Sequence, residues 1–232
     1  MSHLGDLRVV SDVSPAEWVL RRLAPWDLGA DHRLRVCSMV PSGFEAYGRL
    51  LHPAYTLHDG MWSSVRWSEL ALRQRTELRA DSSFSSISGV GTSDPIASSI
   101  REPADGDMDA SDLAELISLL GQWTGTADRG WFCVWDGYGW PELPQQFKGP
   151  PRVKLEHRAC LLCAGRLEDA LTLPMGQAPT LWWPQDRSWC VRTDIDGYST
   201  YVAASNACIA ALISLASIEV LHADPDDDVP PL

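Results

Sequence analysis

The chain has 232 residues, of which 45% are hydrophobic and 22% are charged, a composition typical of a folded globular protein. No apolar stretch approaches the ~20 residues needed to cross a bilayer, which argues against a helical membrane protein. Its 31 acidic residues outnumber 19 basic ones, and the net charge of −12 opposes binding to nucleic acid or anionic lipid.

The first third of the chain predicts short elements separated by prolines. Ser-Pro-Ala-Glu at 14–17 is a helix start signal and predicts a helix over 15–23. A short strand is expected over 34–39. The aromatic residues of 43–54 fit either a helical stripe or an irregular strand, and we favour the strand. Apolar side chains then fall on one face of a predicted helix over 66–79.

The middle of the chain begins with residues 81–110, which are rich in small and polar residues and predict a long surface loop. A loop within one domain and a linker between two domains both fit this composition, and we favour one domain. Leu113 and the apolar residues after it follow a helical repeat that predicts a helix over 111–121. Residues 131–135 are apolar at every position, which indicates a central strand covered on both faces.

The last third predicts strands at 152–165, a short helix at 167–173, and a hairpin over 188–202 that turns at Asp196-Gly197. Ser205 then caps a helix.

A final strand is expected at 217–223, and the acidic, proline-containing residues 223–232 predict a disordered tail. This order of elements indicates an α+β fold, a mixed and mainly antiparallel sheet with helices packed on it, in a single domain over 1–222.

The six cysteines indicate a reducing compartment, because a chain of this length does not need a disulfide framework. The first residues also lack the features of an export signal, so we expect a cytoplasmic protein. Cys160 and Cys163 form a lone CxxC in a predicted strand, where residues three apart point to opposite faces. We therefore expect buried thiols, no metal site and no cofactor.

Four segments carry a resemblance to a known family. They are GFEAYGRLLHPA at 43–54, VRW at 65–67, WFCVWDGYGW at 131–140 and LWWPQDRSWCVRTDIDGYSTYVAAS at 181–205. The WDGYG box followed by WWPxDRxW resembles an uncharacterised family of actinobacterial proteins of similar length. The resemblance spans most of the chain but little of 81–110. It implies a folded unit and transfers no activity and no catalytic residue.

The segment from Leu181 to Val202 is the candidate site, because it gathers tryptophans, acids and an arginine around one predicted hairpin. Neighbouring residues on an extended chain point to opposite sides, so we expect one tryptophan of the Trp182-Trp183 pair near the surface. The candidate binding residues are Trp182, Trp183, Asp186, Arg187, Asp194 and Asp196.

Three functions fit this segment. Aromatic residues and arginine without reaction chemistry are typical of interface centres, which favours a macromolecule-binding module of regulatory or toxin-neutralising kind with a basic protein partner. Paired carboxylates among Asp186, Asp194 and Asp196 fit a carbohydrate-active or other hydrolase. A structural homodimer is the third hypothesis. The sequence leaves open whether the protein is an enzyme.

Overall fold

The computed structural model describes residues 3–26, 34–90, 99–106, 108–137, 147–156 and 158–230. In this part of the chain ten strands form one large sheet, and every pair of neighbouring strands is antiparallel. In order across the sheet the strands are β1 (His3–Leu4), β2 (Leu7–Val9), β9 (Arg158–Gly165), β7 (Gly130–Trp135), β10 (Leu181–Pro184), β11 (Cys190–Thr193), β12 (Ser199–Ala204), β3 (Ala46–Leu51) and β13 (Glu219–Ala223), while β8 (Arg152–Leu155) pairs with β9 off this path.

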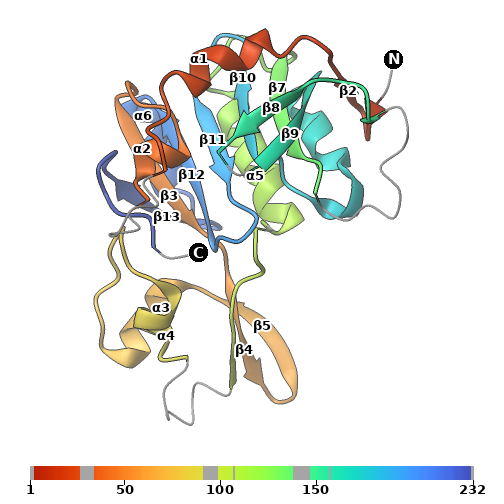
Figure 1. Ribbon diagram of the computed structural model, residues 1–232. Helices are drawn as coiled ribbons and strands as arrows, with labels where there is room; N and C mark the ends of the chain where they lie inside the picture. Colours follow the sequence, from red (N-terminus) through yellow and green to blue (C-terminus); the bar gives the residue numbers. More distant parts are fainter. Residues whose placement is uncertain are drawn as a thin grey trace.

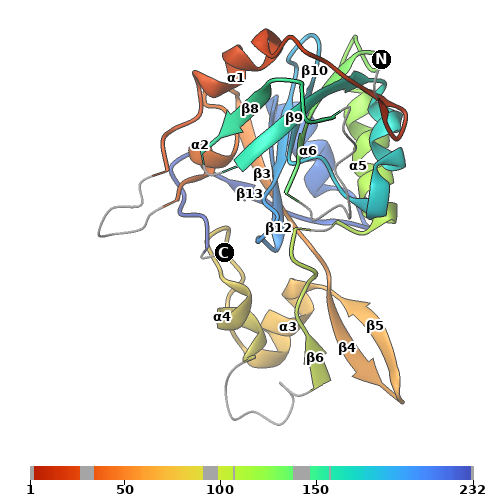
Figure 2. The ribbon, with the colours of Figure 1, turned by 45° about the vertical axis from the view of Figure 1, so that its right-hand side comes forward.

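Helices cover both faces of the large sheet (Figures 1 and 2). On one face, α5 (Ala110–Gly121), α6 (Asn206–Ile213) and the 3-10 helix η4 (Leu167–Thr172) bury apolar side chains in one shared core. On the other face lie the 3-10 helix η1 (Ser14–Ala16), α1 (Glu17–Leu20) and α2 (Val36–Met39). Because both faces are covered, the central strands are buried along almost their whole length. The predicted α+β class is confirmed.

A smaller lobe projects from one end of the large sheet (Figure 1). Its own sheet has the order β5-β4-β6, with bounds Met61–Val65, Ala54–His58 and Ile100–Arg101. The helices α3 (Trp67–Gln74) and α4 (Phe84–Ser88) pack on it. Leu51, Tyr198 and Leu221 join the core of this lobe to the large sheet.

Most of the periodic elements are confirmed by the structure. The predicted helices at 66–79 and 111–121 are α3 and α5, and the predicted hairpin is β11 and β12. Ser205 caps α6 by accepting a hydrogen bond from the backbone N–H of Cys208. Apolar periodicity and capping are properties of short sequence windows, so tertiary packing does not override them here.

Two parts of the predicted loop at 81–110 form regular secondary structure. Residues 84–88 form α4 and residues 100–101 form β6, so 81–110 is not simply a surface loop; Phe84, Ile87 and Ile100 are buried in the core of the lobe. Ser83 caps α4 through its side chain. Only these three buried apolar residues, among many small and polar ones, mark α4 and β6, so the composition alone indicated a loop. Residues 91–98 and 107 lie outside the described residues.

The expected strand at 34–39 is also wrong, because Val36–Met39 is a helix. The predicted disorder of the C-terminal tail is also wrong for residues 223–230, because they pack against this helix. Val36 and Cys37 donate backbone hydrogen bonds to the carbonyls of Asp227 and Pro225, and Val229 is buried. The tail supplies hydrogen-bond acceptors to a helix of one turn that has no side-chain cap.

Five of the six cysteines are buried, and the prediction that Cys160 and Cys163 point to opposite faces is confirmed. Cys160 and Cys163 lie on β9 and contribute to the cores on opposite faces of the sheet. All six cysteines are free thiols. Burial raises the pKa of Cys160 and of Cys163 to about 12, which keeps both thiols protonated at neutral pH.

Candidate functional site

Trp182 and Trp183 are both buried, each with 1% of its surface exposed, so the expectation of one surface tryptophan is wrong. Trp182 contacts Trp189 edge to face, with ring centroids 5.0 Å apart, in the core under α5. Trp183 points to the opposite face and contacts Trp18 at 5.9 Å. The side chains do alternate, but helices cover both sides of β10. Neither ring is available to a partner in the folded protein.

Asp186 and Arg187 form the turn that follows β10. The carboxylate of Asp186 accepts hydrogen bonds from the Thr124 hydroxyl and the Gly125 N–H, both at 2.8 Å, and from the Ser188 N–H at 3.1 Å. Partial burial acts to raise the pKa of Asp186, but these hydrogen bonds outweigh it and lower the pKa. Asp186 thus ties two loops together.

Arg187 has a left-handed backbone with φ of 59°, and its guanidinium lies over the Trp18 ring at 5.2 Å. This cation–π contact closes the outer side of the core that holds Trp183. Asp186 is therefore held by hydrogen bonds and Arg187 by packing on Trp18, both within the fold.

Asp194 and Asp196 meet at one arginine. Nη2 of Arg158 lies 2.7 Å from Oδ1 of Asp194 and 2.6 Å from Oδ2 of Asp196. Asp194 is fully buried, whereas 61% of the Asp196 side chain is exposed. Burial acts to lower the pKa of Arg158, but its hydrogen bonds to both carboxylates raise it. A guanidinium rather than an open gap lies between the two acids, which is the geometry of a structural ion-pair cluster.

The most exposed aromatic residue among those described is Trp62, on the β4–β5 hairpin of the small lobe. Asp59 and Gly60 form its two-residue turn, with positive φ angles of 49° and 79°, as expected of a tight hairpin. Leu57 and Trp62 are paired directly across the hairpin and are 40% and 41% exposed. The sequence signal for this hairpin was the Asp-Gly pair, the same signal that identified the turn at Asp196-Gly197.

In the described part of the chain, no helix lies on one face of this hairpin. Register places Tyr55, Leu57, Trp62 and Arg101 together on this face, because residues directly opposite in neighbouring strands share a side. The Arg101 guanidinium lies 4.6 Å from the centroid of the Trp62 ring. We call these four residues the hairpin face. The other side, which carries Ala54, Val65 and Ile100, packs against α3 and α4.

An acidic groove runs beside the hairpin face. It has a volume of about 340 Å³, and Asp109, Asp112 and Glu69 outnumber Arg66 among its charged lining residues. The Tyr55 hydroxyl donates to the carboxylate of Asp109 at 3.2 Å, which links the groove to the hairpin face. Burial, together with the charges of neighbouring acids, raises the pKa of Asp112. The groove therefore presents acids that a cation would stabilise.

A second cavity, of about 260 Å³, lies where the large sheet meets the small lobe. Arg49 of β3 and Tyr201 of β12 line it from the large sheet, and Trp67 and Phe84 line it from the lobe. Asp105 borders it too. The backbone N–H of Gly106 donates to the carbonyl of Gly197 at 2.9 Å, which holds this segment against the β11–β12 turn. A side chain at Gly106 would meet the backbone of Ile195 at 2.3 Å, so this close approach requires glycine.

Histidines do not form a metal site in the described residues, where no three potential ligands come together. His52 is buried and its Nε2 lies 2.9 Å from the Thr200 hydroxyl. Burial lowers the pKa of His52 to about 4, so the ring is neutral at neutral pH. His58 is exposed on the hairpin, away from this environment.

The comparisons with known proteins give no relative. No protein-family model, no curated protein and no solved structure matches the chain. The helices among the described residues do not combine the length and apolar character needed to cross a bilayer. A proposal about function therefore depends on the geometry of the molecule alone.

Proposed function

We propose that this protein is a protein-binding module that holds a basic partner through its hairpin face. One observation carries the proposal: Trp62, Leu57, Tyr55 and Arg101 lie together on a projecting sheet face that none of the described helices covers. Tryptophan, tyrosine and arginine are the residues enriched at the energetic centres of protein interfaces. We place the contact surface on the small lobe rather than at Trp182–Asp196, because Trp182 and Trp183 are buried and the charged residues of that segment are held by contacts within the fold.

The groove beside the hairpin face supports a basic partner. Asp109 and Asp112 line this groove, Asp109 accepts a hydrogen bond from Tyr55 of the hairpin face, and the whole chain carries a net charge of −12. Attraction between opposite charges speeds the encounter of the two proteins and falls with added salt. The strand β5 is also an edge of its sheet, so its outer backbone groups can pair with an extended segment of the partner.

Affinity purification from the source cells, followed by mass spectrometry, provides the partner for the test. With the purified partner, Trp62→Ala should weaken binding by about 30-fold or more, as expected for a residue worth 2 kcal/mol at an interface. Leu72→Ala is the matched control, because Leu72 is 80% exposed on α3 and lies outside the hairpin face. This control should leave the affinity unchanged.

A second pair of changes tests the charge of the partner. Asp109→Asn combined with Asp112→Asn should slow association and reduce its dependence on salt. A partner that tolerates Trp62→Ala, or an affinity that does not depend on the two acids, would contradict the proposal. Self-association that Trp62→Ala abolishes would replace the basic partner with a second copy of the chain.

A further inference from the structure

Three neighbouring strands bring two arginines and a tyrosine into one buried row. Arg192 of β11 is opposite Tyr201 of β12, and Tyr201 is opposite Arg49 of β3. These side chains share one face of the sheet, and at most 2% of each residue is exposed. Residues 49 and 201 are far apart in the sequence, so only the pairing of β3 with β12 creates this row.

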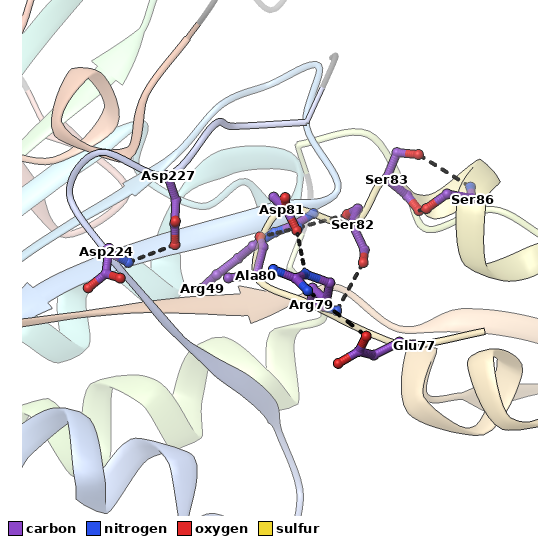
Figure 3. A network of polar contacts seen from close by, with 10 residues as sticks. All are labelled: Arg49, Glu77, Arg79, Ala80, Asp81, Ser82, Ser83, Ser86, Asp224 and Asp227. Carbon is purple, nitrogen blue, oxygen red and sulfur yellow. Dashed lines mark hydrogen bonds and ion pairs between the residues drawn. The ribbon is translucent and has the colours of Figure 1, made fainter.

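Each member of the row keeps hydrogen-bonding capacity that the described residues do not use. Arg49 donates from Nε to the Ser199 hydroxyl and from Nη1 to the carbonyls of Ala80 and Ser82 (Figure 3), but its Nη2 has no partner there. Arg192 donates from Nη1 to the Ser38 carbonyl, while its Nε and Nη2 have none. The buried Tyr201 hydroxyl is also without a partner.

The row also carries positive charge that no described carboxylate neutralises by direct contact. Among the residues that the structure describes, no ion pair within 4.0 Å involves Arg49 or Arg192, and Asp194 on the same face is held by Arg158. Burial lowers the pKa of both Arg49 and Arg192, which reflects the cost of keeping a guanidinium away from water. A buried cation is destabilising until a counter-charge approaches it.

The 260 Å³ cavity gives such a counter-charge a place to bind. Arg49 and Tyr201 form its inner wall, next to the apolar rings of Trp67 and Phe84. A cavity of roughly 150 Å³ is enough to hold benzene, so a ring with a short polar group fits this volume. Cavities for larger ligands usually start at about 300 Å³.

We propose that this cavity binds a small organic monocarboxylate. Its carboxylate accepts hydrogen bonds from Nη2 of Arg49 and from the Tyr201 hydroxyl, and its apolar body packs against Trp67 and Phe84. Arg192 lies behind Tyr201 and adds positive charge without direct contact. This inference is independent of the hairpin face, which lies on the other side of the small lobe's sheet from Trp67 and Phe84.

The outer part of the cavity favours a single negative charge. Asp105 and Asp196 also line it, and both are exposed. Their carboxylates repel the second charge that a phosphate group carries near neutral pH. A monocarboxylate places its charge at the arginine and its uncharged body near these acids.

Calorimetric titration of the full chain with phenylacetate tests the proposal. Phenylacetamide has the same shape without the charge, and we expect it to bind at least about tenfold more weakly, because hydrogen bonds to charged groups are the stronger ones. Inorganic phosphate should not compete. Absence of phenylacetate binding, equal binding of the amide, or stronger binding of phosphate would overturn the proposal.

Tyr201→Phe separates ligand binding from folding. Removing an unpartnered buried hydroxyl should leave the melting temperature unchanged or raise it, and should weaken phenylacetate binding roughly tenfold to a hundredfold. Tyr47→Phe is the matched control, because Tyr47 lies on the same face of the sheet but outside the cavity. An unchanged affinity of Tyr201→Phe, or a melting temperature lower by many degrees, would contradict the assignment.

Discussion

Two tryptophan-bearing regions of this molecule differ in what covers them. Trp182 and Trp183 lie on β10, in the middle of a sheet with helices on both faces, and both are buried. Trp62 lies on a three-stranded sheet with helices on one face only, and it is 41% exposed. Side chains alternate in the same way in both strands. The number of covered faces, rather than the residue type, therefore decides which tryptophan is available to a partner.

The largest effect is expected from truncating the buried pair. Trp182→Ala and Trp183→Ala should each lower the free energy of unfolding by about 3–5 kcal/mol, because each leaves a large cavity in a separate core. Chemical denaturation followed by circular dichroism measures both values. If alanine at one of the two positions changes the free energy of unfolding by only a few tenths of a kcal/mol, that face of β10 is not covered. The contrast between β10 and the hairpin would then be wrong.

The C-terminal segment provides the next test, because it covers part of the large sheet. Deleting Pro225–Leu232 should destabilise the protein by about 2–3 kcal/mol, since it exposes the surface that buried Val229 covers and removes three backbone hydrogen bonds to residues 34–37. Asp226→Ala is the control. Its ion pair with Arg35 is exposed on both sides, so its removal should change stability by less than about 0.5 kcal/mol. An unchanged melting temperature after the deletion would show that the segment does not stabilise the fold.

His52 lies where the large sheet joins the small lobe, and its carbonyl accepts a hydrogen bond from the Trp67 indole at 2.8 Å. Its titration therefore tests the stability of this junction. Its folded pKa of about 4 lies below the unfolded value of 6.5, so the unfolded state binds the proton first as the pH falls. The contribution of neutral His52 to the free energy of unfolding is therefore complete above pH 6.5 and is lost between pH 6.5 and 4.

Between pH 7 and pH 5 this loss should reach roughly 2 kcal/mol, and His52→Gln should remove it. Urea unfolding of both proteins at the two pH values gives the comparison. His222→Gln changes an exposed histidine and should keep the pH dependence of the wild type. If the free energy of unfolding falls equally between pH 7 and pH 5 in His52→Gln and in the wild type, another titratable group causes the loss.

The smallest stability effect is expected at the hairpin face. Trp62→Ala should change the free energy of unfolding by less than about 1 kcal/mol, because Trp62 is 41% exposed and belongs to none of the hydrophobic cores of the described residues. Thermal and chemical denaturation measure this value beside those of Trp182→Ala and Trp183→Ala. A loss as large as theirs would place Trp62 in a core and withdraw it from the proposed interface.

Much of the local structure follows from short sequence windows. The apolar repeat from Leu113 predicts α5, and Ser205 predicts the start of α6. Asp196-Gly197 predicts the turn between β11 and β12, and the spacing of Cys160 and Cys163 places them on opposite faces. These features depend on residues at most a few positions apart, so hydrogen bonding and periodicity within one segment determine them.

The candidate sites depend on long-range contacts instead. Elements from distant parts of the chain bury Trp182 and Trp183, while the small lobe leaves Trp62 41% exposed. Register between β3 and β12 places Arg49 beside Tyr201, although 150 residues separate Arg49 from Ser199, with which it bonds. The sequence by itself determined the strongly periodic helices and strands and how their side chains alternate, but not α2, α4 or β6. Tertiary structure decided which of the two sides meets water, because burial depends on what another part of the chain packs against it.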